Sequence, residues 1–166
     1  MPKQTWKLKP GTTWRDKLER EHPKHGKVVP VSPCLQDRFG TGTLLIPKPR
    51  EVDAVMRKVR KGKLLTVSVL RDVLAKPTAA DQCCPMTTGI FIRIVAETAE
   101  EDRAAGKKRI TPYWRTIRDN GGLNPKYPGG VKAQAKHLRE EGFTVSRGKG
   151  KQPPKVKDFE KFLVKW

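Results

Sequence analysis

The chain has 166 residues, 36% of them hydrophobic and 32% charged, and its 36 lysines and arginines against 17 aspartates and glutamates give a formal net charge of +19. No stretch approaches the roughly 20 consecutive apolar residues of a membrane-spanning helix, and the N-terminus lacks the apolar run of a secretory signal, so we expect a cytoplasmic, nucleoid-associated protein with no membrane partner. So large an excess of positive charge favours a polyanion as partner, and nucleic acid is the commonest polyanion.

The first 48 residues are expected to form a basic N-terminal extension. Its tryptophans, Trp6 and Trp14, stand among lysines and arginines, and we expect them to anchor the extension onto the core rather than to stack on bases. A short helix is predicted over residues 13–21. The apolar run at residues 44–46 predicts a short strand.

Apolar residues recurring at i, i+3, i+4 and i+7 predict three helices in the middle of the chain. They cover residues 49–59, 68–75 and 85–105. Thr66 or Ser68 is suited to cap the second of them. Two helices joined by a turn are typical of a helix-turn-helix module, although the connection of about nine residues is longer than the tight version. Several acidic residues lie in the second half of the third helix, and we do not expect that face to touch phosphate.

A strong turn signal, Asp119-Asn120-Gly121-Gly122, follows the third helix. Residues 110–117 before it and Leu123 after it predict a small hairpin or wing. The remaining predictions are a helix over 131–141, a strand over 143–145, a flexible basic tract over 147–151 and a helix over 157–166.

The three cysteines, Cys34, Cys83 and Cys84, do not make a disulfide framework, because their number is odd and two of them are adjacent. The chain has no Cys-x-x-Cys pair, and a zinc site would need the adjacent cysteines to converge with distant histidines. We therefore expect no metal and no cofactor.

Three motifs occur in order in the second half of the chain: Pro112-Tyr113-Trp114-Arg115, Tyr127-Pro128-Gly129-Gly130 and Glu141-Gly142. With the helices before them, they make residues 60–142, half of the chain, resemble the C-terminal DNA-binding domain of the alkylguanine-DNA alkyltransferases. The spacings match, apart from one extra residue between Gly121 and Tyr127. The resemblance implies a mainly α fold with minor β, a winged helix-turn-helix-like domain over residues 49–146, with basic extensions over 1–48 and 147–166.

The departures from the family pattern bear on the chemistry. In the family the tetrapeptide is Pro-Cys-His-Arg, and its cysteine accepts an alkyl group from a damaged guanine. Here Tyr113 takes the cysteine position, and a phenol with a pKa near ~10 does not replace a thiolate at neutral pH. Trp114 takes the position of the histidine, so Glu141, which matches the family's glutamate, has no proton relay to serve.

A subgroup of the family resembles the chain better. The alkyltransferase-like proteins lack the cysteine, bind alkylated DNA and flag it for other repair machinery. The resemblance therefore implies a monomeric, non-enzymatic protein that binds double-stranded DNA, with repair proteins as further partners. A bulky aromatic residue would line a pocket for an extruded base, where stacking is worth ~1–3 kcal/mol.

The resemblance also implies two sets of site residues. The expected lesion pocket consists of Tyr113, Trp114, Arg115, Tyr127, Gly129 and Gly130. The expected DNA contacts are Lys63, Thr66, Ser68, Met86, Thr87, Thr88, Gly89 and Arg93. Met86 replaces the family's arginine that fills the gap left by a flipped base, and an apolar side chain can wedge between bases. For Tyr113 and Trp114 the alternative is a place in the core, and for Arg115 it is bonding of backbone carbonyls.

Two other functions remain open from the sequence. One is lesion-independent binding of DNA or RNA by a chromosome- or ribosome-associated basic protein, with the basic extensions as contacts. The other is an active alkyltransferase that uses Cys83 or Cys84. Cys84 lies at the start of the longest predicted helix, where a thiolate is stabilised, although both cysteines also fit as small packing residues.

Overall fold

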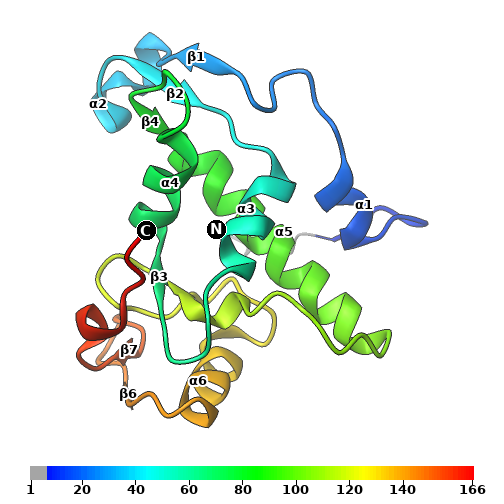
Figure 1. The fold of residues 1–166 in the computed structure, drawn as a ribbon, viewed down its shortest axis with the longest axis vertical. Helices are drawn as coiled ribbons and strands as arrows, with labels where there is room; N and C mark the ends of the chain where they lie inside the picture. Colours follow the sequence, from blue (N-terminus) through cyan, green and yellow to red (C-terminus); the bar gives the residue numbers. More distant parts are fainter. Residues whose placement is uncertain (1–6) are drawn as a thin grey trace.

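The computed structural model describes residues 7–166, which form a mainly helical fold with small sheets (Figure 1). The α-helices are α1 Trp14–Glu19, α2 Gln36–Phe39, α3 Pro49–Arg57, α4 Val67–Ala75, α5 Pro85–Ala104 and α6 Gly130–Glu140. Three short 3-10 helices are η1 Pro33–Leu35, η2 Tyr113–Arg115 and η3 Phe159–Phe162 within that range. The strands are β1 Val28–Pro30, β2 Thr43–Leu45, β3 Leu65–Thr66, β4 Gln82–Cys83, β5 Thr116–Ile117, β6 Val145–Ser146 and β7 Lys155–Val156.

The helices α3, α4 and α5 lie between two smaller parts of the molecule (Figure 1). At one end, β2 pairs antiparallel with β1 and parallel with β4. At the other end, α6 lies beside the antiparallel pair of β6 and β7. Among the helices of residues 7–166, none combines the length and apolar character needed to cross a membrane.

The main core is built around α5, the 20-residue helix. Ile92 and Val95 are each 1% exposed, and they share one cluster with residues of α3 and α4. A second cluster lies under α6, where Leu123 and Leu138 are fully buried. Burial of these apolar side chains is the main favourable term for folding, and it fixes the motif residues 112–115 between α5 and α6.

The N-terminal helix is attached to α5 by acidic side chains. Thr13 caps α1 in a reciprocal box with Asp16. The backbone N–H of Trp14 donates to Glu101 Oε2 (2.9 Å), and Arg15 forms an ion pair with Asp102. Trp14 also packs against the main core, which confirms its expected anchoring role, whereas Trp6 lies outside the described residues. The acidic groups of α5 are thus bound within the molecule.

The helices predicted from apolar periodicity are confirmed, with ends shifted by one or two residues. α3, α4, α5 and α6 occupy the predicted segments, and Thr66 accepts a hydrogen bond from the N–H of Val69 as the cap of α4. The strand predicted at residues 44–46 appears as β2, and the one at 143–145 appears two residues later as β6.

The hairpin predicted around residues 110–123 is wrong. The turn itself forms, with the N–H of Gly121 donating to the carbonyl of Arg118 (2.9 Å). However, β5 pairs in parallel with β3, and the N–H of Leu123 donates to the carbonyl of Pro154. The local backbone bonds across this turn are that one and the bond from the N–H of Arg118 to the carbonyl of Gly122 (2.9 Å), and outside the turn long-range partners take the backbone groups of β5 and Leu123.

The helix predicted over residues 157–166 is also wrong. Asp158 has a left-handed backbone (φ 51°), and only the single 3-10 turn η3 follows it. Beyond this turn the chain runs alongside Leu64, whose N–H donates to the carbonyl of Phe162 (2.8 Å) and whose carbonyl accepts from the N–H of Val164 (2.9 Å). The apolar spacing that resembles a helix instead reflects contacts with the second core cluster.

Candidate nucleic-acid interface

Tyr113 is held between α5 and α6 and is only 1% exposed. Its hydroxyl donates to Glu100 Oε1 of α5 (2.7 Å), and its ring meets Tyr127 edge to face. Burial, followed by the hydrogen bond to Glu100, raises the pKa of Tyr113 well above its usual value. The phenol is therefore protonated at neutral pH and is no substitute for a thiolate.

Trp114 stacks on His137 of α6, with ring centroids 4.3 Å apart and planes inclined by 15°. Its indole N–H donates to Glu141 Oε1 (2.9 Å). Burial lowers the pKa of His137 below its usual value, and the nearby Arg103 lowers it further. The stack therefore contains a neutral imidazole at neutral pH, and Trp114 is fixed at both its face and its nitrogen.

Arg115 and Glu141 form an ion pair that is mostly shielded from solvent. Arg115 Nη2 lies 2.7 Å from Glu141 Oε1, and Arg115 Nη1 donates to the backbone carbonyl of Val59 (2.6 Å). Burial opposes ionisation of Glu141, but the hydrogen bonds from Arg115 and Trp114 outweigh it and lower the pKa of Glu141. Arg115 thus joins the end of α3 to the end of α6. Its bond to a backbone carbonyl is the structural role that the sequence left open for it as the alternative to a place in the lesion pocket.

A cavity of about 460 Å³ opens beside Tyr113. Ligand pockets are typically about 300–1,000 Å³, so the cavity is of ligand-binding size. It is lined by Glu100, Arg103, Tyr113, Pro128, Gly129, Ala133, Lys136, His137 and Glu140. Two basic and two acidic side chains surround the ring and the imidazole, so the cavity offers both donors and acceptors to a polar, flat ligand.

Gly129 and Gly130 give α6 its starting geometry at the mouth of this cavity. Both have positive φ angles, 75° and 68°, which favour glycine. A Cβ placed on Gly129 would lie 2.6 Å from the Cβ of Ala133, whereas Gly142, with φ 95°, has no atom within 4 Å of the equivalent position. Tyr127 lies under this turn, where its hydroxyl donates to the carbonyl of Thr116 (2.9 Å).

Substitution of Gly129 by alanine is expected to lower the free energy of unfolding by about 1–3 kcal/mol, because it adds both backbone strain and a close contact. Gly142→Ala adds only the backbone strain and is the matched control. Urea denaturation of both variants measures the difference. Equal losses for the two variants would show that the contact with Ala133 is relieved at no cost.

The start of α5 presents apolar side chains to solvent. Met86 is 47% exposed and Ile90 38%, and Gly89 beside them is exposed. Steps of three and four residues place Met86, Ile90 and Arg93 on one face that continues to Glu100 at the cavity. Arg93 forms an ion pair with Glu97 at 3.8 Å. The exposed apolar end and the cavity therefore lie along the same face of α5.

Thr87 and Thr88 bond within the molecule. The hydroxyl of Thr87 donates to Cys84 Sγ (3.2 Å), and that of the fully buried Thr88 donates to the carbonyl of Cys84 (2.7 Å). Because the side chain of Thr88 has no exposed surface, it cannot contact DNA in this conformation. The predicted DNA contact at Thr88 is therefore wrong, and the residue packs in the interior.

The start of α4 is already occupied by a carboxylate. The backbone N–H of Ser68 donates to Asp119 Oδ1 (2.8 Å), and the buried Thr66 serves as the cap. Asp119 supplies the negative charge that a helix N-terminus favours, so a phosphate gains little there. The structure therefore gives no support to Thr66 and Ser68 as phosphate contacts. Lys63 lies elsewhere, in a larger groove that Trp166 also lines.

Cys83 and Cys84 are both buried, at 1% and 7% exposure. Burial raises the pKa of the Cys83 thiol, and Cys84 packs in a small cluster with Val31 and Leu44. Reactive cysteines are usually accessible thiolates. These positions therefore favour the packing role over the nucleophilic one.

Several cavity residues were not predicted from the sequence, namely Glu100, Arg103, Lys136, His137 and Glu140. The three residues of α6 could have been predicted from helical spacing. Lys136, His137 and Glu140 follow Ala133 at steps of three and four residues, so they lie on the same face as Gly129. The residues of α5 gave no such signal, because their place beside Tyr113 depends on how the chain turns after residue 104.

The lowered pKa of His137 predicts a loss of stability in mild acid. The imidazole binds fewer protons in the folded state than in the unfolded state, so its contribution is present above about pH 6.5 and is lost as the pH falls below that value. His25, whose pKa is also lowered by burial, acts in the same direction. His137→Gln is expected to reduce, but not abolish, the fall in unfolding free energy from about pH 7.5 to about pH 5.5. An unchanged fall would contradict this assignment.

The chain resembles a known protein in its fold and not detectably in its sequence. No family model matches the chain, and no curated protein matches its sequence. Among solved structures, the chain is similar to Atl1 from S. pombe, crystallised in complex with damaged DNA containing O6-carboxymethylguanine. The match covers 70% of this chain and 94% of that chain, with 15% sequence identity and a TM-score of 0.48. Similarity at this level establishes neither a family nor a function for the chain.

Proposed function

We propose that this chain is a non-enzymatic DNA-binding protein of the alkyltransferase-like kind, which binds duplex DNA through a winged helix-turn-helix-like domain. The observation that carries the proposal is the cavity of about 460 Å³ beside Tyr113. Its lining places the Tyr113 ring and the His137 imidazole beside donors and acceptors, on a chain of net charge +19. A base rotated out of the duplex is bound by such groups, because it stacks on a flat surface and forms hydrogen bonds through its edge.

The exposed start of α5 supports contact with the duplex on the same face. Met86 and Ile90 are suited to wedge between base pairs, as apolar side chains do in proteins that kink DNA. The acidic Glu97 and Glu100 further along α5 do not favour phosphate. Phosphate contacts are therefore assigned to the basic side chains around this face, with Arg103 and Lys136 at the cavity.

Energetics favour a lesion over a normal pair in such a cavity. Extrusion of a base costs a few kcal/mol, and it costs least where pairing is already weakened. Stacking and hydrogen bonds in the cavity return an amount of the same order. A guanine that carries an alkyl group pairs poorly, so it is the base that this balance would select.

A second candidate function is lesion-independent binding of nucleic acid. Because Tyr113 is only 1% exposed, its ring offers little area to a base unless the cavity opens further. Binding through exposed lysines and arginines needs no such opening. The buried ring is the observation that favours this candidate.

A comparison of two duplexes separates the candidates. Fluorescence anisotropy would measure the affinity of the protein for a duplex with one alkylated guanine and for the same duplex undamaged. The proposal predicts about tenfold tighter binding of the damaged duplex. Equal affinities would support the second candidate. If neither duplex bound more tightly than an acidic polymer of equal charge, both candidates would fail.

A further inference from the structure

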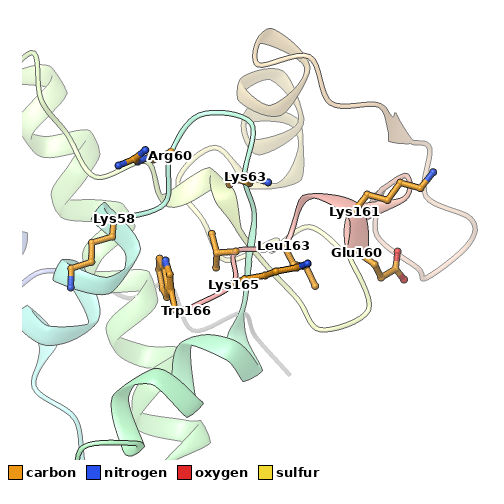
Figure 2. A pocket seen from close by; sticks show the side chains of 9 residues that line it. Lys58, Arg60, Lys63, Glu160, Lys161, Leu163, Lys165 and Trp166 are labelled. Carbon is orange, nitrogen blue, oxygen red and sulfur yellow. The ribbon is translucent and has the colours of Figure 1, made fainter.

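A second groove lies away from the Tyr113 cavity and is larger than it. It has a volume of about 1190 Å³, and no residue lines both it and the cavity. Two segments far apart in the sequence form it, the loop after α3 and the chain end from η3 onward (Figure 2). The backbone bonds between Leu64 and residues 162 and 164 hold these segments together. The groove is therefore defined by the fold rather than by a loose tail.

Positive charge dominates the walls of this groove. Its basic residues are Lys58, Arg60, Lys63, Lys161 and Lys165, against the one acidic residue Glu160. Lys161 pairs with Asp158 at 3.6 Å. Within residues 7–166, the side chains of Lys58, Arg60, Lys63 and Lys165 have no ion pair or hydrogen bond. Unpaired cations that converge on one concave surface favour an anionic ligand.

Trp166 stands in the same groove and is 53% exposed. Figure 2 shows its ring between Lys58 and Lys165, with Arg60 and Lys63 along the adjoining loop. Trp114, by contrast, has its ring stacked on His137 and its nitrogen bonded to Glu141. Trp166 therefore offers a ring surface that the fold does not use.

We propose that this groove binds single-stranded nucleic acid, with the cations on the phosphates and a base stacked on Trp166. A basic groove with an exposed aromatic ring is the usual arrangement for this ligand. A duplex hides the faces of its bases, and so gives the ring nothing to stack on. A membrane surface would need a broader apolar face, whereas Leu163 and Val164 are half-buried against the core.

The first test removes the ring. Trp166→Ala is expected to weaken binding of an oligonucleotide of about 15 nucleotides by about 5- to 150-fold, whereas Trp166→Phe should retain much of the affinity. Oligothymidylate and oligouridylate are tested in parallel, because DNA and RNA share the same phosphates and stacking faces. On an abasic oligonucleotide of the same length, the alanine variant should bind as the wild type does. An equal loss on the abasic strand, or no loss on any strand, would overturn the proposal.

The second test separates the groove from net charge. The double variant R60Q/K63Q removes two cations from the groove, and K24Q/K27Q removes two exposed lysines outside it. For each phosphate that the groove variant no longer neutralises, the slope of log affinity against log salt on single strands should become shallower by about 0.7. The groove variant should also weaken binding more than the control does, and equal effects would overturn the proposal. The result is independent of the Tyr113 cavity, because preference for an alkylated duplex does not enter either measurement.

Discussion

Replacing Arg115 with alanine is expected to lower the free energy of unfolding by about 3–5 kcal/mol, the usual effect of breaking a buried ion pair. The side chains of Arg115 and Glu141 are only 14% and 9% exposed. Removal of the guanidinium leaves the Glu141 carboxylate with the Trp114 N–H, and the carbonyl of Val59 loses its side-chain donor. Urea denaturation near neutral pH measures the loss.

Two features make this prediction specific. Arg115→Lys keeps the positive charge but not the planar fork that reaches Glu141 and Val59 together, so its loss should be smaller than that of the alanine variant. The lowered pKa of Glu141 also means that the stability from this pair is lost as the pH falls through the acidic range. A loss below about 1 kcal/mol, the size seen for exposed pairs, would show that the pair is not a structural link.

The affinity for duplex DNA is expected to fall by about 10³–10⁵ between 50 and 200 mM salt, as for proteins that contact 6–10 phosphates. The physical reason is the net charge of +19. In addition, some acidic side chains are bound to other parts of the protein: Glu101 and Asp102 bind α1, and Glu141 binds Arg115. These three acidic side chains are therefore bound within the fold and do not offset the positive charge of the surface lysines and arginines.

A titration of a fluorescent duplex at several salt concentrations gives this dependence as the slope of log affinity against log salt. The same slope is measured for the variant K24Q/K27Q, which shows how much the removal of two exposed charges alone changes it. A slope close to zero would contradict binding of duplex DNA through its phosphates, and with it the proposed function.

The sequence predicted the helices because their signal is local. Apolar side chains at helical spacing were sufficient to locate α3, α4, α5 and α6. Strand pairing is not local. Nothing in residues 110–123 indicates that β5 pairs with β3, and nothing in residues 157–166 indicates that Leu64 takes the backbone bonds of that segment.

The candidate site divides in the same way. The motif spacing placed Tyr113 and Gly129 together, and both line one cavity. It did not show that Asp119 reaches the start of α4 or that Thr88 turns inward to Cys84. Those two contacts depend on tertiary packing. For the same reason the sequence did not predict Arg103 of α5 as a cavity residue.

The central claim is that a damaged base enters the cavity beside Tyr113. The most direct test compares the preference for a damaged duplex in the wild type and in a variant whose cavity is filled. Ala133 lines the cavity, and Ala133→Phe fills it, whereas Ala54→Phe adds the same ring to an exposed position of α3. Affinities for the alkylated and the undamaged duplex are compared for both variants and the wild type. We expect Ala133→Phe to lose the preference while its affinity for the undamaged duplex is unchanged, and Ala54→Phe to keep both. A wild-type preference in the Ala133→Phe variant would contradict the account, because no base would then enter the cavity.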